Sequence, residues 1–191
     1  MTWYDYSNTE DSWDSWDNTE DSWGNQVAWV GTLSVDFGGD TYDDWRLPTT
    51  VDGLGIYGTD GTTTVGHNIT TSELGHLFYD ELGNQGEYDT SGVYVGSGNY
   101  GLNNTGDFQD LVSGPYWSGT EYASFPATAW GFNFTNGSQG TNFIEGPPNR
   151  SALAVRSGDV AAVPEPATFA LLGIGLAGMV GYGVRRRLQL R

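Results

Sequence analysis

The chain has no cysteine and no lysine among its 191 residues, and it has only two histidines. Without cysteine there can be no disulfide, no thiol nucleophile and no zinc site of the cysteine type. Residues 1–163 hold 23 of the 24 acidic residues but only three arginines, so their net charge is −20, against −17 for the whole chain. Because such a surface repels phosphate backbones, we expect no nucleic-acid partner.

Long apolar runs are scarce too, and one dominates the last 29 residues. Ala167–Val184 is an uncharged segment of 18 residues, and a helix of that length reaches roughly 27 Å, close to the roughly 30 Å of a hydrocarbon core. Arginines that follow an apolar span mark its cytoplasmic side, and here they are Arg185, Arg186 and Arg187. The pattern predicts a transmembrane helix over residues 167–184 and a basic cytoplasmic tail over residues 185–191. A buried helix of a soluble core is the alternative.

The motif Val163-Pro164-Glu165-Pro166 precedes this segment, within a linker over residues 161–166. The motif, the glycine-rich span and the arginine cluster, in this order, closely resemble the PEP-CTERM sorting signal of exported bacterial proteins. This resemblance implies export, anchoring in the inner membrane, and processing by an exosortase that would read Pro164, Glu165 and Pro166. It also implies a final place at the cell surface or outside the cell, with membrane lipid and extracellular polysaccharide as candidate partners. The alternative is a chance Pro-Glu-Pro linker before an ordinary anchor.

The N-terminal segment is acidic and repetitive, because Asn8–Trp13 recurs as Asn18–Trp23. We expect residues 1–22 to be a duplicated, solvated and poorly ordered insert. A calcium loop is the alternative, although the ligand order of an EF-hand is absent. Residues 1–23 also lack the basic start and apolar run of an export signal. We therefore expect the true start of the gene product to lie upstream.

Residues 23–160 carry the signals of a folded domain, two of which indicate helices. Helical spacing predicts a first helix over residues 23–34, with Trp23, Val27, Val30 and Ser34 on one side. Thr70 and Glu73 have the spacing of a capping box at the start of a second helix. Gly83 predicts its end, after an apolar stripe of Leu74, Leu77, Phe78 and Leu82.

The last third of this domain shows strand patterns. Trp130, Phe132 and Phe134 alternate with Gly131 and Asn133, which places three aromatic side chains on one face of a strand. Asn136-Gly137 is a favoured hairpin turn. Further strands are predicted over residues 116–122, 141–144 and 152–156, the last with Leu153 and Val155 facing inward. Antiparallel strands packed on one or two helices make an α+β domain.

A second resemblance rests on motifs that follow one another along this domain. They are Asp44–Thr49, Glu73-Leu74 with Phe78, Tyr116–Glu121, Ala129-Trp130 with Phe132 and Phe134, and Ala154–Arg156. Together they resemble the Lcl C-terminal-like domain family, which is similar to the C-type-lectin-like and formylglycine-generating-enzyme folds. The resemblance implies a C-type-lectin-like fold for residues 23–160 and no single activity. The cysteines of formylglycine-generating enzymes are absent, so that activity does not carry over.

No residue pattern is typical of a catalytic centre. Glu73 and His76 form Glu-x-x-His, a spacing found in carboxylate-bridged metal sites, but the second copy that such sites need is missing. We expect His76 to be a surface or packing residue, and His67, in a Gly/Thr-rich loop, to be exposed. No Gly-x-Ser-x-Gly motif occurs. We therefore expect no enzyme activity, cofactor or metal, and a secreted hydrolase is the least favoured alternative.

The arginines within residues 1–163 indicate how the domain is held together. Arg46 and Arg156 stand beside tryptophan, leucine and valine in segments typical of a core. We expect each to be a structural arginine held by a carboxylate, because a buried charge needs a partner. The candidate carboxylates are Asp44, Glu121 and Asp159. The alternative role for these arginines is anion binding.

Aromatic side chains suggest a second kind of function. On a surface they can stack on sugar rings, and the candidates are Trp117, Trp130, Phe132 and Phe134, although strand aromatics are more often part of the core. The sequence thus favours a non-catalytic, exported surface or extracellular-matrix protein. A carbohydrate-binding or calcium-dependent adhesin is the alternative.

Overall fold

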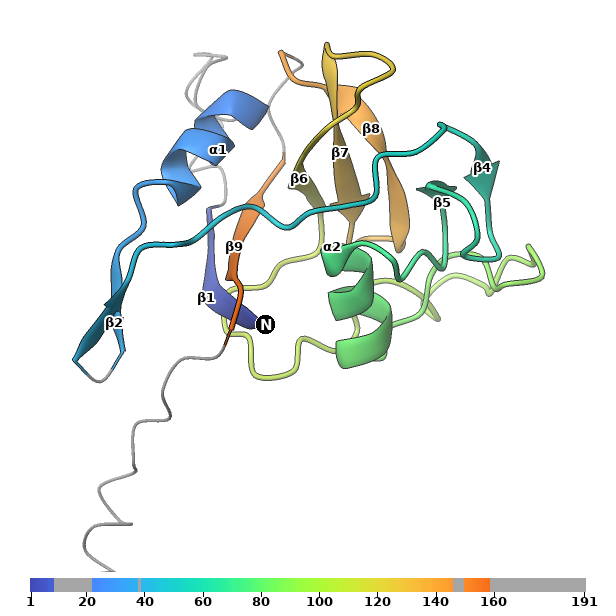
Figure 1. Cartoon of the computed structure of the whole chain (residues 1–191). Coiled ribbons are helices and arrows are strands. Elements are labelled where there is room, and N and C mark those ends of the chain that lie inside the picture. The colour runs from blue at the N-terminus through green and yellow to red at the C-terminus, as the bar shows by residue number, and fades with distance from the viewer. Residues whose placement is uncertain (9–21, 38, 146–149, 159–191) are drawn as a thin grey trace, which may run out of the picture. The chain divides into compact units, whose positions relative to one another are not determined.

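The computed structural model of the protein describes residues 1–8, 22–37, 39–145 and 150–158 (Figure 1). The chain divides into two units, and the larger, here called the body, comprises Met1–Val35 and Tyr42–Asp159. The smaller unit includes Asp36–Thr41. Around that segment, β2 (Val35–Phe37) and β3 (Asp40–Tyr42) pair as a two-stranded sheet.

The largest sheet of the body has five strands in the order β4-β5-β8-β7-β6. They are β4 (Tyr57–Gly58), β5 (Val65–Gly66), β6 (Pro115–Glu121), β7 (Thr128–Asn133) and β8 (Ser138–Phe143). All neighbours pair antiparallel except β4 and β5, which are parallel. The predicted Asn136-Gly137 turn joins β7 to β8, and Gly137 has a φ of 74°, in the left-handed region that favours glycine.

A second sheet pairs β1 (Thr2–Asn8) with β9 (Ala152–Arg156), with Thr2 opposite Arg156 (Figure 1). All five residues of β9 are buried, whereas alternation predicted that only Leu153 and Val155 face inward. The strand is covered on a further side, because Val155 also bridges to the backbone of Arg46. Residues 2–8 therefore form a strand, which corrects the expectation of a poorly ordered insert for that part of 1–22. Most of the acidic repeat lies outside the described residues.

The first helix, α1 (Trp23–Val30), is shorter than predicted and turned differently. Ser22 caps its start by accepting the N–H of Asn25. The indole N–H of Trp23 donates to the carbonyl of Ser118 in β6 at 2.8 Å, which fixes how the helix is rotated. Val27, expected on the inner face, is 40% exposed, and the residues that are buried are Gln26 and Val30.

The second helix begins as α2 (Glu73–His76) and continues as the π-helical turn η1 (Leu77–Glu81). The predicted capping box of Thr70 and Glu73 is wrong, because Ser72 is the N-cap and accepts the N–H of Gly75 at 3.1 Å. The predicted apolar stripe is buried. Gly83, with a φ of 65°, comes directly after the C-cap residue Leu82, so the helix ends where the glycine predicted.

The hydrophobic core lies where that stripe meets the aromatic residues of β6 and β7. The ring of Phe78 stands 5.4 Å from that of Phe132 and 5.6 Å from that of Phe134. The cluster comprises Leu74, Leu77, Phe78, Leu82, Leu111, Tyr116, Phe132, Phe134 and Leu153. Two short helices packed against a largely antiparallel sheet make the described fold α+β, as predicted.

Candidate functional site

Arg46 is bound by a carboxylate of the second helix. Its guanidinium donates to both oxygens of Glu73, at 2.6 and 2.8 Å, and Glu73 also accepts the backbone N–H of Thr49 at 2.6 Å. The hydrogen bond to Glu73 raises the pKa of Arg46. Burial by itself would raise the pKa of Glu73, but the bonds from Arg46 and Thr49 lower it. Glu73 was not among the expected partners, and the Arg46 side chain is 36% exposed, so it is not a buried core residue.

Arg156, at the end of β9, is bound by Asp44. Its Nε and one terminal nitrogen donate to the two carboxylate oxygens at 2.6 and 3.1 Å. The hydrogen bond raises the pKa of Arg156 and lowers that of Asp44. The guanidinium carbon also lies 4.2 Å from the centroid of the Tyr42 ring. Asp44 is one of the three candidate carboxylates named from the sequence. The ion pair joins the end of β9 to the segment that contains Asp44.

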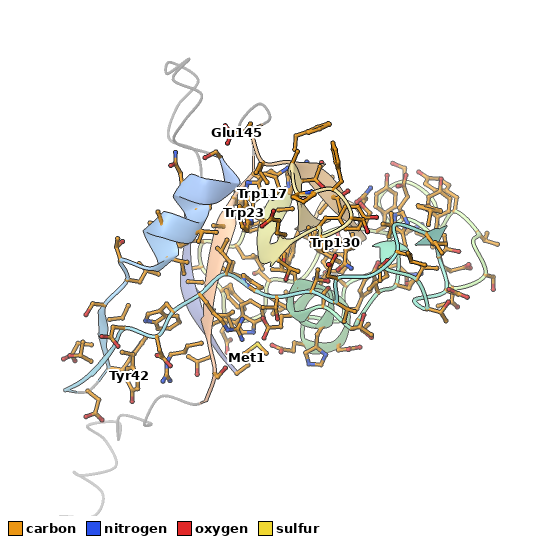
Figure 2. All side chains as sticks on the ribbon, turned by 45° about the horizontal axis from the view of Figure 1, so that its top comes forward. Met1, Trp23, Tyr42, Trp117, Trp130 and Glu145 are labelled. Carbon is orange, nitrogen blue, oxygen red and sulfur yellow. The ribbon has the colours of Figure 1, made fainter. Side chains whose placement is uncertain are left out.

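The third arginine of the acidic part, Arg150, lies 4.9 Å above the ring of Trp117. Burial lowers its pKa. Figure 2 shows Trp117 and Trp23 close together, and the indole of Trp23 binds the residue after Trp117. Arg150 therefore packs on the tryptophan side of β6, and its carbonyl accepts the side-chain amide N–H of Gln26 in α1 at 3.4 Å.

The aromatic residues proposed from sequence as a sugar platform are core residues. Trp117 is 3% exposed, Phe132 is 1% exposed, and both Trp130 and Phe134 are fully buried. The Trp130 indole N–H donates to Asp52 at 3.0 Å. These four residues are therefore the core aromatics that the sequence favoured, and the alternative in which they stack on sugars is wrong.

Glu73 and His76 do not form a metal site. Glu73 is engaged by Arg46, and His76 lies with Nδ1 2.8 Å from Asp80 and Nε2 3.5 Å from Glu81 on the exposed side of the helix. Within the residues that the structure describes, no group of three or more His, Cys, Asp or Glu side chains could hold a metal ion. His76 is the surface histidine that the sequence favoured.

His67 was expected to be exposed and is instead 4% exposed. It follows β5 and lies under two tyrosine rings, with centroids 6.3 Å away for Tyr57 and 5.1 Å away for Tyr88. Its Nδ1 is 3.4 Å from the Tyr57 hydroxyl. Its Nε2 has no hydrogen-bond partner within the described residues and lies 3.8 Å from a carboxylate oxygen of Glu87. Burial lowers the pKa of His67, and Glu87 offsets part of that effect.

The rings around His67 continue across the surface. Tyr88 stands 6.1 Å from Tyr94, and Tyr94 stands 5.9 Å from Tyr100. A hydrogen bond with Tyr94 raises the pKa of Tyr100. Two of the residues are exposed, since Tyr57 is 60% and Tyr94 48% accessible to solvent. We call Tyr57, Tyr88, Tyr94 and Tyr100 the tyrosine cluster.

The sorting motif Pro164, Glu165 and Pro166, the membrane segment 167–184 and the stop Arg185, Arg186 and Arg187 lie outside the described residues. Among the residues that are described, no helix has the length and apolar character needed to cross a bilayer.

Comparison with known proteins tests the C-terminal signal independently. Residues 162–187 match the family model of the PEP-CTERM protein-sorting motif. This motif marks a chain for export, for anchoring through its C-terminal end and for exosortase-dependent sorting to the surface. No curated protein and no solved structure matches the chain. The likeness of the body to the Lcl and C-type-lectin-like folds therefore stays a prediction.

Sequence reasoning missed the tyrosine cluster, although the sequence contains a signal for it. Tyr88, Tyr94 and Tyr100 recur every six residues in a segment otherwise rich in glycine and serine. Large aromatic residues spaced evenly through a turn-rich loop have no helix or strand to bury them. Such residues either fold back on one another or remain at the surface, and here they do both.

Proposed function

We propose that this protein is a non-catalytic component of the bacterial surface or extracellular matrix. It is held in the inner membrane by residues 167–184 and processed by an exosortase that reads Pro164, Glu165 and Pro166. The observation that carries the proposal is the match of residues 162–187 to the PEP-CTERM sorting motif. The uncharged 18-residue run followed by three arginines supports the anchor and its orientation.

The chemistry of the described body supports a binding or structural role. The carboxylate and histidine that most resembled reactive groups are engaged by neighbours, Glu73 by Arg46 and His76 by Asp80. His67 is buried under aromatic rings. A general base must reach the proton that it removes, whereas His67 is 4% exposed and has the Tyr57 hydroxyl as its neighbour, and His76 is paired with Asp80. Carbohydrate binding, the alternative function, finds its support in the exposed tyrosines rather than in the tryptophans.

Sorting is tested in a bacterium that encodes an exosortase and in the same strain without it. The full chain, behind an export signal and an epitope tag, is followed by cell fractionation and by the mass of its C-terminal peptide. We expect the tail to be removed and the body to reach the surface only where the exosortase is present. Replacing Pro164, Glu165 and Pro166 together by alanine should leave uncleaved protein in the inner membrane.

The matched control is Glu145→Ala, which removes one exposed acidic residue from the body and should be processed normally. Processing that is equally efficient without the exosortase, or a full-length product in the cytosol of the complete strain, would contradict the proposal.

A further inference from the structure

We propose that the tyrosine cluster is a docking surface for a neutral polysaccharide chain. The proposal assigns a ligand to the body. It rests on the proposed function in one respect, because only an exported body would meet such a polymer. The cluster comprises Tyr57 of β4 and Tyr88, Tyr94 and Tyr100 of the loop that follows the second helix, with His67 beneath them.

The geometry of the rings suits an extended ligand. Five rings follow one another, from Tyr57 through His67 and Tyr88 to Tyr94 and Tyr100, with successive centroids between 5.1 and 6.3 Å apart. The two exposed rings, Tyr57 and Tyr94, are not neighbours in this series, because His67 and Tyr88 lie between them. A polymer that crosses the series could therefore contact more than one ring.

The chemistry of tyrosine matches the two sides of a sugar. A pyranose ring presents C–H groups on its faces and hydroxyls around its rim, and a tyrosine presents an apolar face beside a hydroxyl that donates and accepts hydrogen bonds. Large apolar side chains grouped on a surface mark interaction sites more often than single exposed residues do.

The loop that presents the tyrosines is held in place by a backbone bridge and by side-chain hydrogen bonds to its backbone. Tyr88 and Tyr94 form an antiparallel bridge, and Asp89 closes the turn between them by accepting the N–H groups of Ser91 and Val93 at 2.8 and 3.0 Å. Asn68, in the left-handed conformation with a φ of 58°, donates its amide to the carbonyls of Thr59 and Tyr88. A surface that is already ordered loses less entropy when it binds.

His67 fits the role of a support for this surface. A buried ring nitrogen without a partner costs free energy, and Nε2 of His67 is such an atom among the described residues. The ring holds Tyr57 and Tyr88 apart at T-shaped contacts and bonds the Tyr57 hydroxyl through Nδ1. His67 therefore packs beneath the proposed surface and does not itself contact the ligand.

Charge selects a neutral polymer over an anionic one. Glu87 and Asp89 flank the rings, while the three arginines of the acidic part are bound elsewhere, by Glu73, by Asp44 and over the Trp117 ring. The net charge of −20 over residues 1–163 repels uronic-acid or sulfated chains. The same carboxylates can accept hydrogen bonds from the hydroxyls of an uncharged sugar.

The test is affinity electrophoresis of the full chain in non-ionic detergent, in native gels that contain dextran, hydroxyethyl cellulose, galactomannan or alginate. We expect at least one of the three neutral polymers to retard the protein and alginate to have no effect. Tyr57→Ala combined with Tyr94→Ala should weaken retardation about tenfold or more, since each stacking contact contributes on the order of 1 kcal/mol. Tyr94→Phe keeps the ring and should retain most of the binding.

The matched control removes another exposed aromatic pair, Phe125 and Phe143, whose rings stand 6.0 Å apart and which no ring contact joins to the cluster in the described body. Phe125→Ala with Phe143→Ala should leave retardation unchanged, and thermal unfolding of every variant establishes that it folds. The proposal is overturned if only alginate retards the protein, or if none of the neutral polymers does. It is also overturned if the control pair of substitutions weakens retardation as much as the tyrosine pair. So does a loss of self-association by the tyrosine variants in sedimentation without any polysaccharide effect. The sorting experiment has a separate readout, so either proposal can fail alone.

Discussion

Glu73 binds Arg46 through both carboxylate oxygens, at 2.6 and 2.8 Å, and the same carboxylate accepts the N–H of Thr49. Arg46 in turn exchanges two backbone hydrogen bonds with Val155, each at 2.9 Å. One carboxylate therefore joins the start of the second helix to the segment that lies beside β9. The contact links three parts of the chain that are far apart in sequence.

Glu73→Gln should lower the free energy of unfolding by about 1–2 kcal/mol, because hydrogen bonds to a charged group are lost while partial exposure of Arg46 limits the effect. The carboxylate's contribution is complete above its ordinary pKa of 4.5 and is lost as the pH falls through its lowered pKa in the fold. The measurement is urea denaturation at pH 7 and pH 3. Asp80→Asn, on the exposed side of the same helix, should change stability by less than about 0.5 kcal/mol. Equal effects of the two changes at pH 7 would contradict this assignment.

His67 should make the protein less stable as the pH falls below its ordinary pKa of 6.5. Because burial lowers the pKa of His67 in the fold, the unfolded chain takes up a proton at a higher pH than the folded protein does. His67→Gln should therefore flatten the dependence of the urea midpoint on pH between 7.5 and 5.5. His76→Gln, which removes the exposed histidine instead, is the control with which the effect of His67→Gln is compared. Identical slopes for the parent and His67→Gln would rule out this role for burial.

Gly137→Ala should destabilise the β7–β8 hairpin by about 2–4 kcal/mol. The φ of 74° is strained for alanine, and an added Cβ would stand 2.5 Å from the Tyr79 hydroxyl and 2.9 Å from the Cα of Gly86. Gly140→Ala, in the next strand, meets nothing within 4 Å and should have little effect. Thermal melting of the two variants tests this contrast, which would fail if both melted at the temperature of the parent.

Phe132→Ala should cost about 3–5 kcal/mol, because it leaves a cavity between the second helix and the sheet. Phe132 is 1% exposed, whereas Phe143, on the adjacent strand, is 62% exposed. Phe143→Ala is therefore a matched aromatic control and should be nearly neutral. The comparison by chemical denaturation separates core aromatics from surface ones, and a larger loss for Phe143 would reverse their assignment.

Regular patterns made the helices and strands predictable. The apolar stripe ending at Leu82, the glycine after it and the alternating aromatics of β7 all lie where local periodicity places them. The details that failed depend on distant partners. Ser72 rather than Thr70 caps the second helix because Glu73 turns toward Arg46. Val27 faces outward because Trp23 bonds to β6.

The candidate site was harder to foresee for the same reason. A histidine between glycine and asparagine gives no local sign of burial, and only the approach of Tyr57 and Tyr88 covers His67. Alternation likewise placed Trp130 and Phe132 on one face of a strand without telling which face is covered. The sorting signal needs no tertiary partner, since its three elements are contiguous, and it was recognisable from residues alone.

The end of β9 is also the place where a load applied from the C-terminal side would enter the described body. Arg156 is clamped there by Asp44, and the Thr2 hydroxyl donates to the carbonyl of Gly158 at 2.7 Å. A pull transmitted from a membrane tether through the C-terminal side would reach these two contacts before the rest of the strand. Tension would then be shared between the β1 strand and the segment around Asp44, so that β9 is not peeled away by itself.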